Sequence, residues 1–227
     1  MVFPGKVGAV IPAAGAGRRF GEKKQFKQLG RRPLLYKTLK PFLDCDLVRE
    51  VAVVVPEEDV VQIHREIKSI SSATNLFVVA GGNLRQNSVQ SGILALSEDC
   101  SLICIHDCAR PFVTEEMIIS TINGCEDTDG CIIAEPSIDT VKKIQNGFVE
   151  KTLDRKYIWL AQTPQTFHRD ILIKALENAQ NNEIIATDES SLVERIGGKV
   201  KVIEGLPGNK KITNQLDWKI LEAGIID

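Results

Sequence analysis

The chain has 227 residues, of which 43% are hydrophobic and 26% are charged, and its formal net charge is −2. This composition suits one large globular domain, and the near-neutral charge argues against nucleic acid as the main partner. No apolar run approaches the ~18–20 residues that span a membrane, and the first residues lack the apolar core of a signal peptide. We therefore expect a cytoplasmic protein that binds neither a membrane nor nucleic acid.

A loop of small residues at 12–17 follows the first predicted strand, at 7–11. Small residues let the backbone approach a ligand closely, and successive N–H groups form an anion-binding concavity. The pattern fits neither a dinucleotide fingerprint nor a Walker A loop. The stretch predicts a polyphosphate site, and the alternative is an ordinary glycine-rich turn with surface cations. The positive charge expected near the phosphates comes from Arg18, Arg19, Lys23 and Lys24.

Strand and helix patterns then alternate along the chain. Runs rich in β-branched residues predict strands at 48–56, 77–80, 102–105 and 131–134, and apolar residues at helical spacing predict helices at 34–43, 57–70, 84–96 and 114–125. This alternation predicts an α/β fold, a Rossmann-like, mostly parallel sheet with helices on both faces. Ligands of such sheets bind beyond the carboxyl ends of the strands, where the motifs PAAGAGRR, GGN and HDCARP all fall.

The order changes near residue 137. Two β-rich runs at 139–144 and 148–153 flank Asn146-Gly147, which is the strongest short hairpin signal. We predict a β-arm over 137–160 that interrupts a single domain of 1–227. A two-stranded arm is marginal alone, so it either pairs with another protomer's arm or folds back on its own domain. Later patterns predict helices at 169–181, 187–196 and from 214, a strand at 199–203 and a basic loop at 208–213.

The six cysteines form no Cys-x-x-Cys pair, and the chain has only three histidines. Cys100, Cys104 and Cys108 are spaced by four, but they fall on a strand and its exit loop rather than on one helix face. A zinc site is therefore not expected. We interpret all six cysteines as buried free thiols in a reducing compartment.

Asp107 follows the strand at 102–105, at the same edge of the sheet as the basic loop. A carboxylate there can hold a divalent cation that bridges phosphate oxygens, since magnesium often takes only one or two protein carboxylates. The alternative is a buried carboxylate that caps the next turn. No serine lies in a Gly-x-Ser-x-Gly motif. An inventory of Lys, Arg, backbone N–H and one Asp suits phosphoryl or nucleotidyl transfer, which depends on positioning and charge neutralisation.

The chain resembles the 2-C-methyl-D-erythritol 4-phosphate cytidylyltransferases of the non-mevalonate isoprenoid route. The resemblance covers nearly the whole chain and rests, in order, on PAAGAGRRF, KQF, GRRPLL, GGNLRQNSV, HDCARPF, DTVK, TLDRK, QTPQTF, TDESS and NKKIT. It implies a nucleotide-diphospho-sugar transferase type of fold and a homodimer in which the arm is exchanged. It also implies that CTP and a sugar-alcohol phosphate react, with magnesium, to give a CDP-linked alcohol and pyrophosphate.

The resemblance assigns roles to individual residues. Arg19 and Lys24 are expected to hold the CTP phosphates, and Asp107 is expected to bind magnesium. Arg155 and Lys211 complete the catalytic set, with Arg155 reaching the partner's site. Nucleotide contacts are expected from Ala13, Ala14, Gly15, Gly82, Asn83, Ser88 and Cys108, the last near the ribose. Contacts to the alcohol phosphate are expected from Thr140, Arg155, Thr163, Thr187 and Lys211.

Three residues depart from the family pattern, without removing a charge needed for transfer. Lys23 replaces a usual proline, Asn83 replaces a frequent aspartate, and Phe20 replaces a usual methionine in what we interpret as a packing change. Three rival functions stay open: a ribitol-5-phosphate cytidylyltransferase, a sugar-1-phosphate nucleotidyltransferase that uses UTP or GTP, and a catalytically silent nucleotide-binding regulator. The PAAG opening favours methylerythritol, and the complete charged set disfavours the silent regulator.

Overall fold

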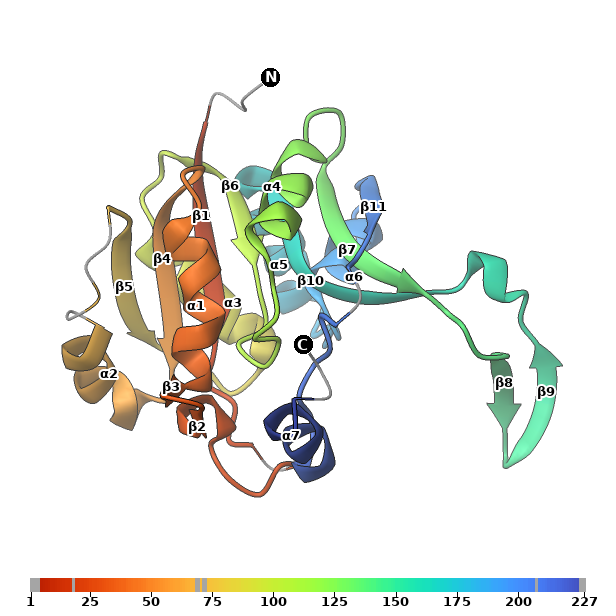
Figure 1. The fold of residues 1–227 in the computed structure, drawn as a ribbon. Helices are drawn as coiled ribbons and strands as arrows, with labels where there is room; N and C mark the ends of the chain where they lie inside the picture. The colour runs from red at the N-terminus through yellow and green to blue at the C-terminus, as the bar shows by residue number, and fades with distance from the viewer. Residues whose placement is uncertain (1–4, 18, 68–69, 71–72, 207, 225–227) are drawn as a thin grey trace.

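The computed structural model describes residues 5–17, 19–67, 70, 73–206 and 208–224. Within these residues, a seven-stranded sheet runs in the order β11-β7-β10-β6-β1-β4-β5 (Figure 1). Neighbouring strands pair in parallel, except that β10 is antiparallel to both β6 and β7. The predicted mostly parallel α/β fold is confirmed. The strands are β1 (Lys6–Pro12), β4 (Val48–Val55), β5 (Asn75–Ala80), β6 (Cys100–Ile105), β7 (Gly130–Pro136), β10 (Trp159–His168) and β11 (Val200–Glu204).

Helices cover both faces of this sheet. One face packs against α1 (Leu34–Asp44), α2 (Val60–Ile67) and α4 (Glu115–Asn123), and the other against α3 (Arg85–Ala95), α5 (Arg169–Asn181) and α6 (Glu189–Arg195). In β4, Val51 and Val53 belong to the first core and Ala52 and Val54 to the second. A strand buried on both faces has no polar side, which explains its continuous apolar sequence. In the described part of the chain, no helix is long and apolar enough to cross a membrane.

Element boundaries agree with the predictions to within a few residues, with one difference at the second helix. The helix predicted at 57–70 begins as a 3-10 turn, η2 (Glu57–Asp59), before α2. Residues 68 and 69 of that prediction lie outside the described residues. Three short elements that the sequence did not predict follow the first loop: η1 (Lys24–Phe26), β2 (Gln28–Leu29) and β3 (Arg32–Pro33).

A third, smaller core joins the loop after β1 to the last helix, α7 (Gln215–Glu222). Phe20 is buried there, and its ring meets that of Trp218 edge-on at 5.7 Å between centroids. The interpretation of Phe20 as a packing residue is confirmed. Ile212 belongs to the same core, so this cluster holds the basic loop that follows residue 207 against the loop after β1.

No strand is predicted over 159–168, yet β10 lies in the middle of the sheet. The prediction failed because Pro164 interrupts the run, and proline normally argues against a central strand. Pairing with β7 shifts register between Ala161 and Gln165, so Pro164 lies where the ladder does not need its missing N–H. The polar side chains of this strand are buried and hydrogen-bonded within the protein; Gln162, for example, donates to Glu135.

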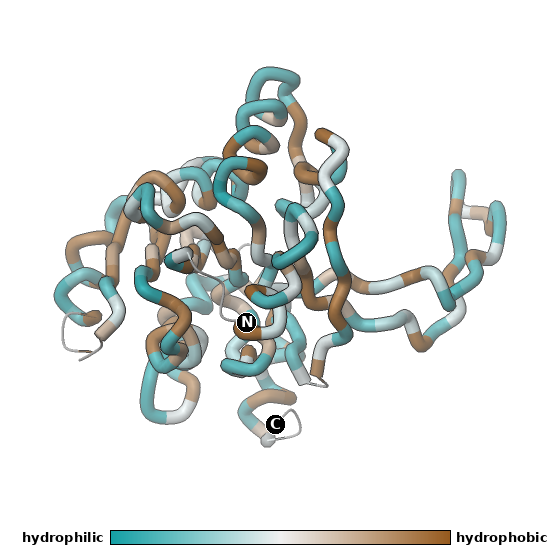
Figure 2. The backbone as a smooth tube through the Cα atoms, turned by 90° about the horizontal axis from the view of Figure 1, so that it is seen from above, coloured by the Kyte–Doolittle hydropathy of each residue, from teal (hydrophilic) through white to brown (hydrophobic). Residues whose placement is uncertain are grey.

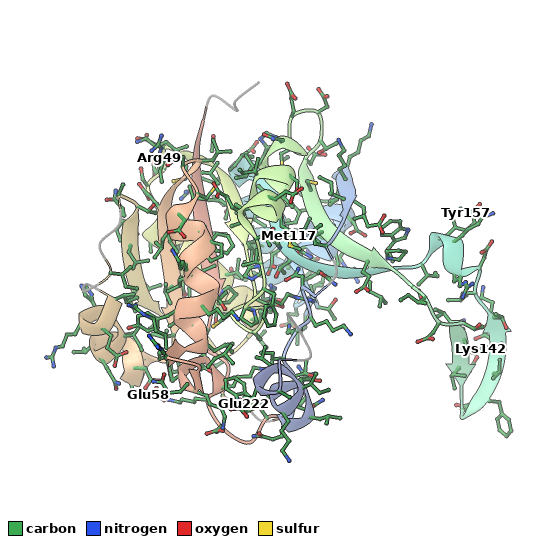
Figure 3. The ribbon with its side chains drawn as sticks, viewed as in Figure 1. Arg49, Glu58, Met117, Lys142, Tyr157 and Glu222 are labelled. Carbon is green, nitrogen blue, oxygen red and sulfur yellow. The ribbon has the colours of Figure 1, made fainter. Side chains whose placement is uncertain are left out.

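The predicted arm is present as a hairpin of β8 (Lys142–Gln145) and β9 (Phe148–Thr152), followed by the 3-10 turn η3 (Arg155–Tyr157). Asn146 and Gly147 have φ of 52° and 84°, as an Asn-Gly hairpin turn requires. The arm stands clear of the sheet in both views of the backbone (Figures 1 and 2), so the alternative in which it folds back is wrong. Lys142 and Tyr157 lie far from core residues such as Met117 (Figure 3).

Candidate active site

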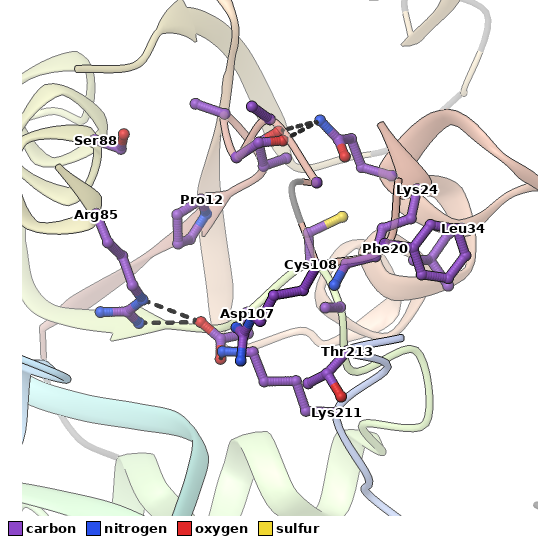
Figure 4. A pocket seen from close by; sticks show the side chains of 18 of the residues that line it. Pro12, Phe20, Lys24, Leu34, Arg85, Ser88, Asp107, Cys108, Lys211 and Thr213 are labelled. Atoms are coloured by element: carbon purple, nitrogen blue, oxygen red, sulfur yellow. Dashed lines mark hydrogen bonds and ion pairs between the residues drawn. The ribbon is translucent and has the colours of Figure 1, made fainter. Parts of the chain in front are cut away.

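A cavity of about 560 Å³ opens where β1 and β6 end (Figure 4). Its walls come from the loop after β1, the start of α3, the exit of β6 and the basic loop before α7. Segments far apart in the chain thus meet at the edge of the sheet where the sequence predicts a site. The predicted residues that line the cavity are Ala13, Ala14, Gly15, Arg19, Lys24, Gly82, Asn83, Ser88, Asp107, Cys108 and Lys211.

The loop after β1 is bonded by Gln25, to which the sequence analysis assigned no role. The Gln25 side-chain amide donates to the carbonyl oxygens of Ala13, at 2.8 Å, and Gly15, at 3.1 Å. Gln25 is buried, so losing it would leave both carbonyls without these bonds. The KQF motif places Gln25 close to the loop in the chain, but the sequence does not show which groups its side chain bonds.

The two glycines of this loop are expected to respond differently to alanine. Gly17 has φ +65°, and a Cβ there would lie 1.8 Å from the carbonyl oxygen of Glu22, whereas a Cβ on Gly15 meets nothing within 4 Å. We expect Gly17→Ala to lower the free energy of unfolding by about 1–3 kcal/mol. Gly15→Ala should change it by less than about 0.5 kcal/mol. Urea denaturation checks both, and equal losses in the two variants would contradict this account.

Two adjacent lysines that follow this loop have different partners. Lys24 lines the cavity, and its ammonium donates to the carbonyl oxygen of Ile212 at 2.5 Å. Lys23 instead forms ion pairs with Glu58, at 2.8 Å, and Asp59, at 2.6 Å, and is not part of the cavity wall. The prediction that Lys23 adds charge at the phosphates is therefore wrong. Arg18, which the same prediction included, lies outside the described residues.

Burial, followed by the charges of Lys211 and Arg19, lowers the pKa of Lys24. A bound triphosphate would offset this by favouring the ammonium form. Below the lowered pKa, Lys24 is charged with or without ligand, and binding takes up no proton there. Above it, the free lysine is neutral and binding must reprotonate it.

We therefore expect the affinity for a triphosphate, which the family resemblance implies is CTP, to fall as the pH rises through the lowered pKa of Lys24. Titration calorimetry in buffers of different ionisation enthalpy should show proton uptake on that alkaline side. Lys24→Arg keeps its charge at all these pH values and should abolish the uptake. Uptake of equal size in Lys24→Arg would assign it to another group.

Asp107 lies at the base of the cavity and pairs with three cations, the most distant of which is Arg110, whose Nε lies 3.9 Å from Oδ2. Lys211 Nζ lies 2.6 Å from Oδ2, and Arg85 Nε lies 3.2 Å from Oδ1 (Figure 4). Arg85 also donates through Nη1 to both carboxylate oxygens of Glu189, at 2.6 Å. Burial opposes ionisation of Asp107, but the charges of Arg85 and Lys211 outweigh it and hold the pKa of Asp107 well below its usual range. Asp107 is therefore a carboxylate at any physiological pH.

Arg85 is a residue of the cavity wall that the sequence analysis missed, although it lies within the GGNLRQNSV motif. A cation in the first turn of a helix is disfavoured by the helix dipole. Its presence at the start of α3 was therefore a usable signal that carboxylate partners lie nearby. Which carboxylates these are, Asp107 and Glu189, depends on the tertiary fold.

The described part of the cavity wall offers one carboxylate, that of Asp107, to a divalent cation. Among the residues described, no group of three or more His, Cys, Asp or Glu side chains could hold a metal. Magnesium usually keeps several waters and takes phosphate oxygens besides one or two carboxylates, so Asp107 alone fits that ion at a phosphate site. Its Oδ2 is bonded to Lys211, so a cation that binds this oxygen would compete with the Lys211 contact.

Four of the predicted substrate residues lie outside the cavity wall. Thr163 is buried behind Asp107, and Thr187 is exposed just before Asp188, whose side chain caps α6. Thr140 and Arg155 are exposed on the arm, away from this cavity. Their substrate roles remain predictions.

All six cysteines are free and buried, as predicted. Cys108 lines the cavity, and burial raises the pKa of its thiol to about 12. It therefore presents an uncharged surface to a ligand, which is compatible with a sugar contact and not with a nucleophile.

A family model described as 2-C-methyl-D-erythritol 4-phosphate cytidylyltransferase matches residues 7–226. The chain belongs to this family. Proteins of that name from Syntrophus aciditrophicus (strain SB) and Aquifex aeolicus (strain VF5) are each 40% identical to it, over 96% and 94% of this chain and 95% of each relative. The resemblance stated from the sequence motifs is confirmed, and the family is one of nucleotidyltransferases.

Solved structures agree with this assignment. The 4-diphosphocytidyl-2C-methyl-D-erythritol synthase from Anaerococcus prevotii DSM 20548 matches with a TM-score of 0.87 and 32% identity, over 97% of this chain and 98% of that one. The 2-C-methyl-D-erythritol 4-phosphate cytidylyltransferase from Thermus thermophilus matches with a TM-score of 0.78 and 30% identity, over 96% and 98% of the two chains.

Proposed function

We propose that this chain transfers the cytidylyl group of CTP to 2-C-methyl-D-erythritol 4-phosphate, in the synthesis of isoprenoid precursors. An oxygen of the alcohol phosphate attacks the α-phosphorus of CTP. The bond from that phosphorus to the bridging oxygen of the β-phosphate breaks, and pyrophosphate leaves. The observation that carries the proposal is the single cavity in which Arg19, Lys24 and Lys211 converge beside Asp107.

The reaction brings two anions together, so its main obstacle is charge. Two unit charges about 4 Å apart interact by roughly 4 kcal/mol at an effective dielectric near 20. Arg19 and Lys24 would neutralise the triphosphate, and Lys211 would neutralise the attacking phosphate. Cations that gain contacts as charge develops at the α-phosphorus accelerate the step rather than only binding substrate.

Asp107 would hold a magnesium ion, which supplies positive charge to the phosphate oxygens when bound. In this structure Lys211, Arg85 and, at a longer distance, Arg110 neutralise this carboxylate. Lys211 would leave Asp107 when the substrates bind and turn to the alcohol phosphate. Arg85 would stay, because Glu189 holds its other edge.

The arm supports a homodimer. We propose that residues 137–160 of one subunit reach the other subunit, and that 1–227 otherwise forms one nucleotidyltransferase domain. A two-stranded hairpin that packs against nothing is only marginally stable, so we expect its exposed apolar side chains to be buried against another surface. Thr140 and Arg155 would then contact the alcohol phosphate in the partner's cavity. The exposed apolar residues on and beside the arm are Ile138, Ile144, Phe148, Val149, Tyr157, Trp159 and Leu160.

The location proposed for the enzyme is a reducing compartment, the cytoplasm. Free thiols persist where glutathione and thioredoxin keep them reduced. All six cysteines of the chain are of this kind.

Pyrophosphate release tests the proposal. Purified protein is incubated with magnesium, one nucleotide (CTP, UTP or GTP) and one of three acceptors: methylerythritol 4-phosphate, ribitol 5-phosphate or a sugar 1-phosphate. We expect release only with CTP and methylerythritol 4-phosphate. Release with ribitol 5-phosphate or with UTP or GTP would point to the rival transferases, and no release with any acceptor would point to the silent regulator.

A further inference from the structure

Buried hydrogen bonds link Thr163 of β10 to the turn that carries Asp107. The main-chain N–H of Asp107 donates to Thr163 Oγ1 at 3.0 Å. Thr163 Oγ1 lies 2.9 Å from His106 Nδ1, and His106 Nε2 lies 2.9 Å from the carbonyl oxygen of Arg110. His106 is fully buried, Thr163 is 4% exposed, and neither belongs to the cavity wall in the part of the chain described.

The partners fix the direction of every bond. A carbonyl oxygen only accepts, so His106 Nε2 must carry a proton to bond Arg110. The ring is fully buried and both of its nitrogens meet uncharged groups, a carbonyl oxygen and a hydroxyl, so it is neutral and Nδ1 carries no proton. Nδ1 therefore accepts, and the Thr163 hydroxyl donates to it. Since that hydroxyl has a single proton, it has none left for a substrate oxygen.

We propose that Thr163 is a positioning residue that fixes Asp107 from behind, with His106 in its Nε2–H form as the acceptor that orients the threonine hydroxyl. This replaces the direct substrate contact that the family resemblance implies for Thr163. The proposal rests on the proposed function, because Asp107 matters there as the cation-holding carboxylate.

The same threonine also anchors the loop that carries Lys211. The Asn209 side chain donates to the carbonyl oxygen of Thr163 at 2.8 Å and to Gln162 Oε1 at 2.9 Å. The Asn209 carbonyl oxygen accepts from Arg110 Nη1 at 2.7 Å. Asn209 is buried and lies two residues before Lys211. Thr163 thus holds both members of the Asp107–Lys211 pair, through its hydroxyl on one side and its carbonyl on the other.

Nuclear magnetic resonance of the wild-type enzyme tests the bond directions without turnover. The chain has three histidines, so a long-range ¹H–¹⁵N correlation, assigned with His64→Gln and His168→Gln, isolates His106. We expect a proton on Nε2 and none on Nδ1 at neutral pH, unchanged when methylerythritol 4-phosphate is added. A proton on Nδ1, or a change of tautomer on adding this compound, would overturn the proposal. Failure of the proposed function would show separately, as wild-type enzyme that releases no pyrophosphate.

Kinetics of a matched pair of variants test the role. Thr163→Val has nearly the same shape without the hydroxyl, whereas Thr163→Ser keeps it. Because a misplacement of about 1 Å can cost roughly 10²-fold in rate, we expect Thr163→Val to lower kcat by about that factor, with KM for the alcohol phosphate within about threefold. Thr163→Ser should restore kcat to near the wild-type value.

The opposite pattern, a changed KM with an unchanged kcat, would contradict a positioning role for Thr163. If Thr163 Oγ1 bound the phosphate directly, Thr163→Val would mainly raise KM for the alcohol phosphate and leave kcat nearly unchanged. Circular dichroism and urea denaturation establish that both variants are folded. Should Thr163→Val not fold, the histidine tautomer in the wild type and in Thr163→Ser decides the question.

Discussion

Replacing Lys24 with alanine is expected to lower the rate of cytidylyl transfer by about 10²–10³-fold, the range seen when one group that stabilises transition-state charge is removed. Lys24 is half-buried in the cavity wall beside Arg19 and Lys211. Burial and the charges of Lys211 and Arg19 lower the pKa of Lys24, and bound phosphates would favour its charged form. The variant should therefore lose more rate than stability.

The neighbouring lysine supplies the matched control. Lys23→Ala removes the same charge one residue earlier, but this ammonium pairs with Glu58 and Asp59 outside the cavity. We expect its turnover to stay within about threefold of wild type, since exposed ion pairs contribute little. Pyrophosphate release at saturating CTP and magnesium compares the two variants. Similar losses in both would show that net charge, not position, explains the effect of Lys24.

Arg155→Ala is expected to lower transfer by about 10²-fold, because an arginine that holds a phosphate contributes charge and two directed bonds. Arg155 lies on the arm, clear of the cavity of its own chain. If the arm is exchanged, the loss is felt in the partner's cavity. The variant should remain dimeric in sedimentation, since the apolar side chains of the arm are untouched.

Mixed dimers decide whether Arg155 acts across subunits. A heterodimer of one Arg155→Ala subunit and one Lys24→Ala subunit, purified by two different tags, has one cavity with an intact Lys24 and an intact partner arm. It should regain about half of the activity of the same amount of wild-type dimer. If Arg155 served its own cavity, neither site would be complete and the heterodimer would stay as inactive as its parents.

The sheet could be predicted from the sequence because a strand that is buried on both faces is a continuous run of apolar residues. Val51 and Val53 face one core and Val54 the other, so β4 is recognisable from its residues alone. β10 has no such apolar run, since most of its buried residues are polar and bond distant partners, as Thr163 does with His106 and Asn209. Secondary-structure propensity depends on neighbouring residues, whereas these hydrogen-bond partners lie far away in the chain.

The functional site, like the sheet, was predicted only in part. Motifs placed Lys24 and Asp107 at one edge of the sheet, and the structure brings them together. Local sequence could not tell which of two adjacent lysines enters the cavity, because the choice depends on Glu58 and Asp59, thirty-five and thirty-six residues away from Lys23. It also gave Arg85 no role, although a cation at a helix N-terminus was a sign of nearby carboxylates.

The reversed direction of β10 makes the arm a topological insertion. β7 and β10 are antiparallel neighbours, and Ser137 N–H still bonds the carbonyl oxygen of Ile158 at 2.9 Å where the arm leaves them. A tight turn of a few residues could join two such strands. The length of the arm can therefore change without disturbing the ladder beneath it. Only the residues that reach the partner's cavity, Thr140 and Arg155 in our proposal, tie the sequence of the arm to catalysis.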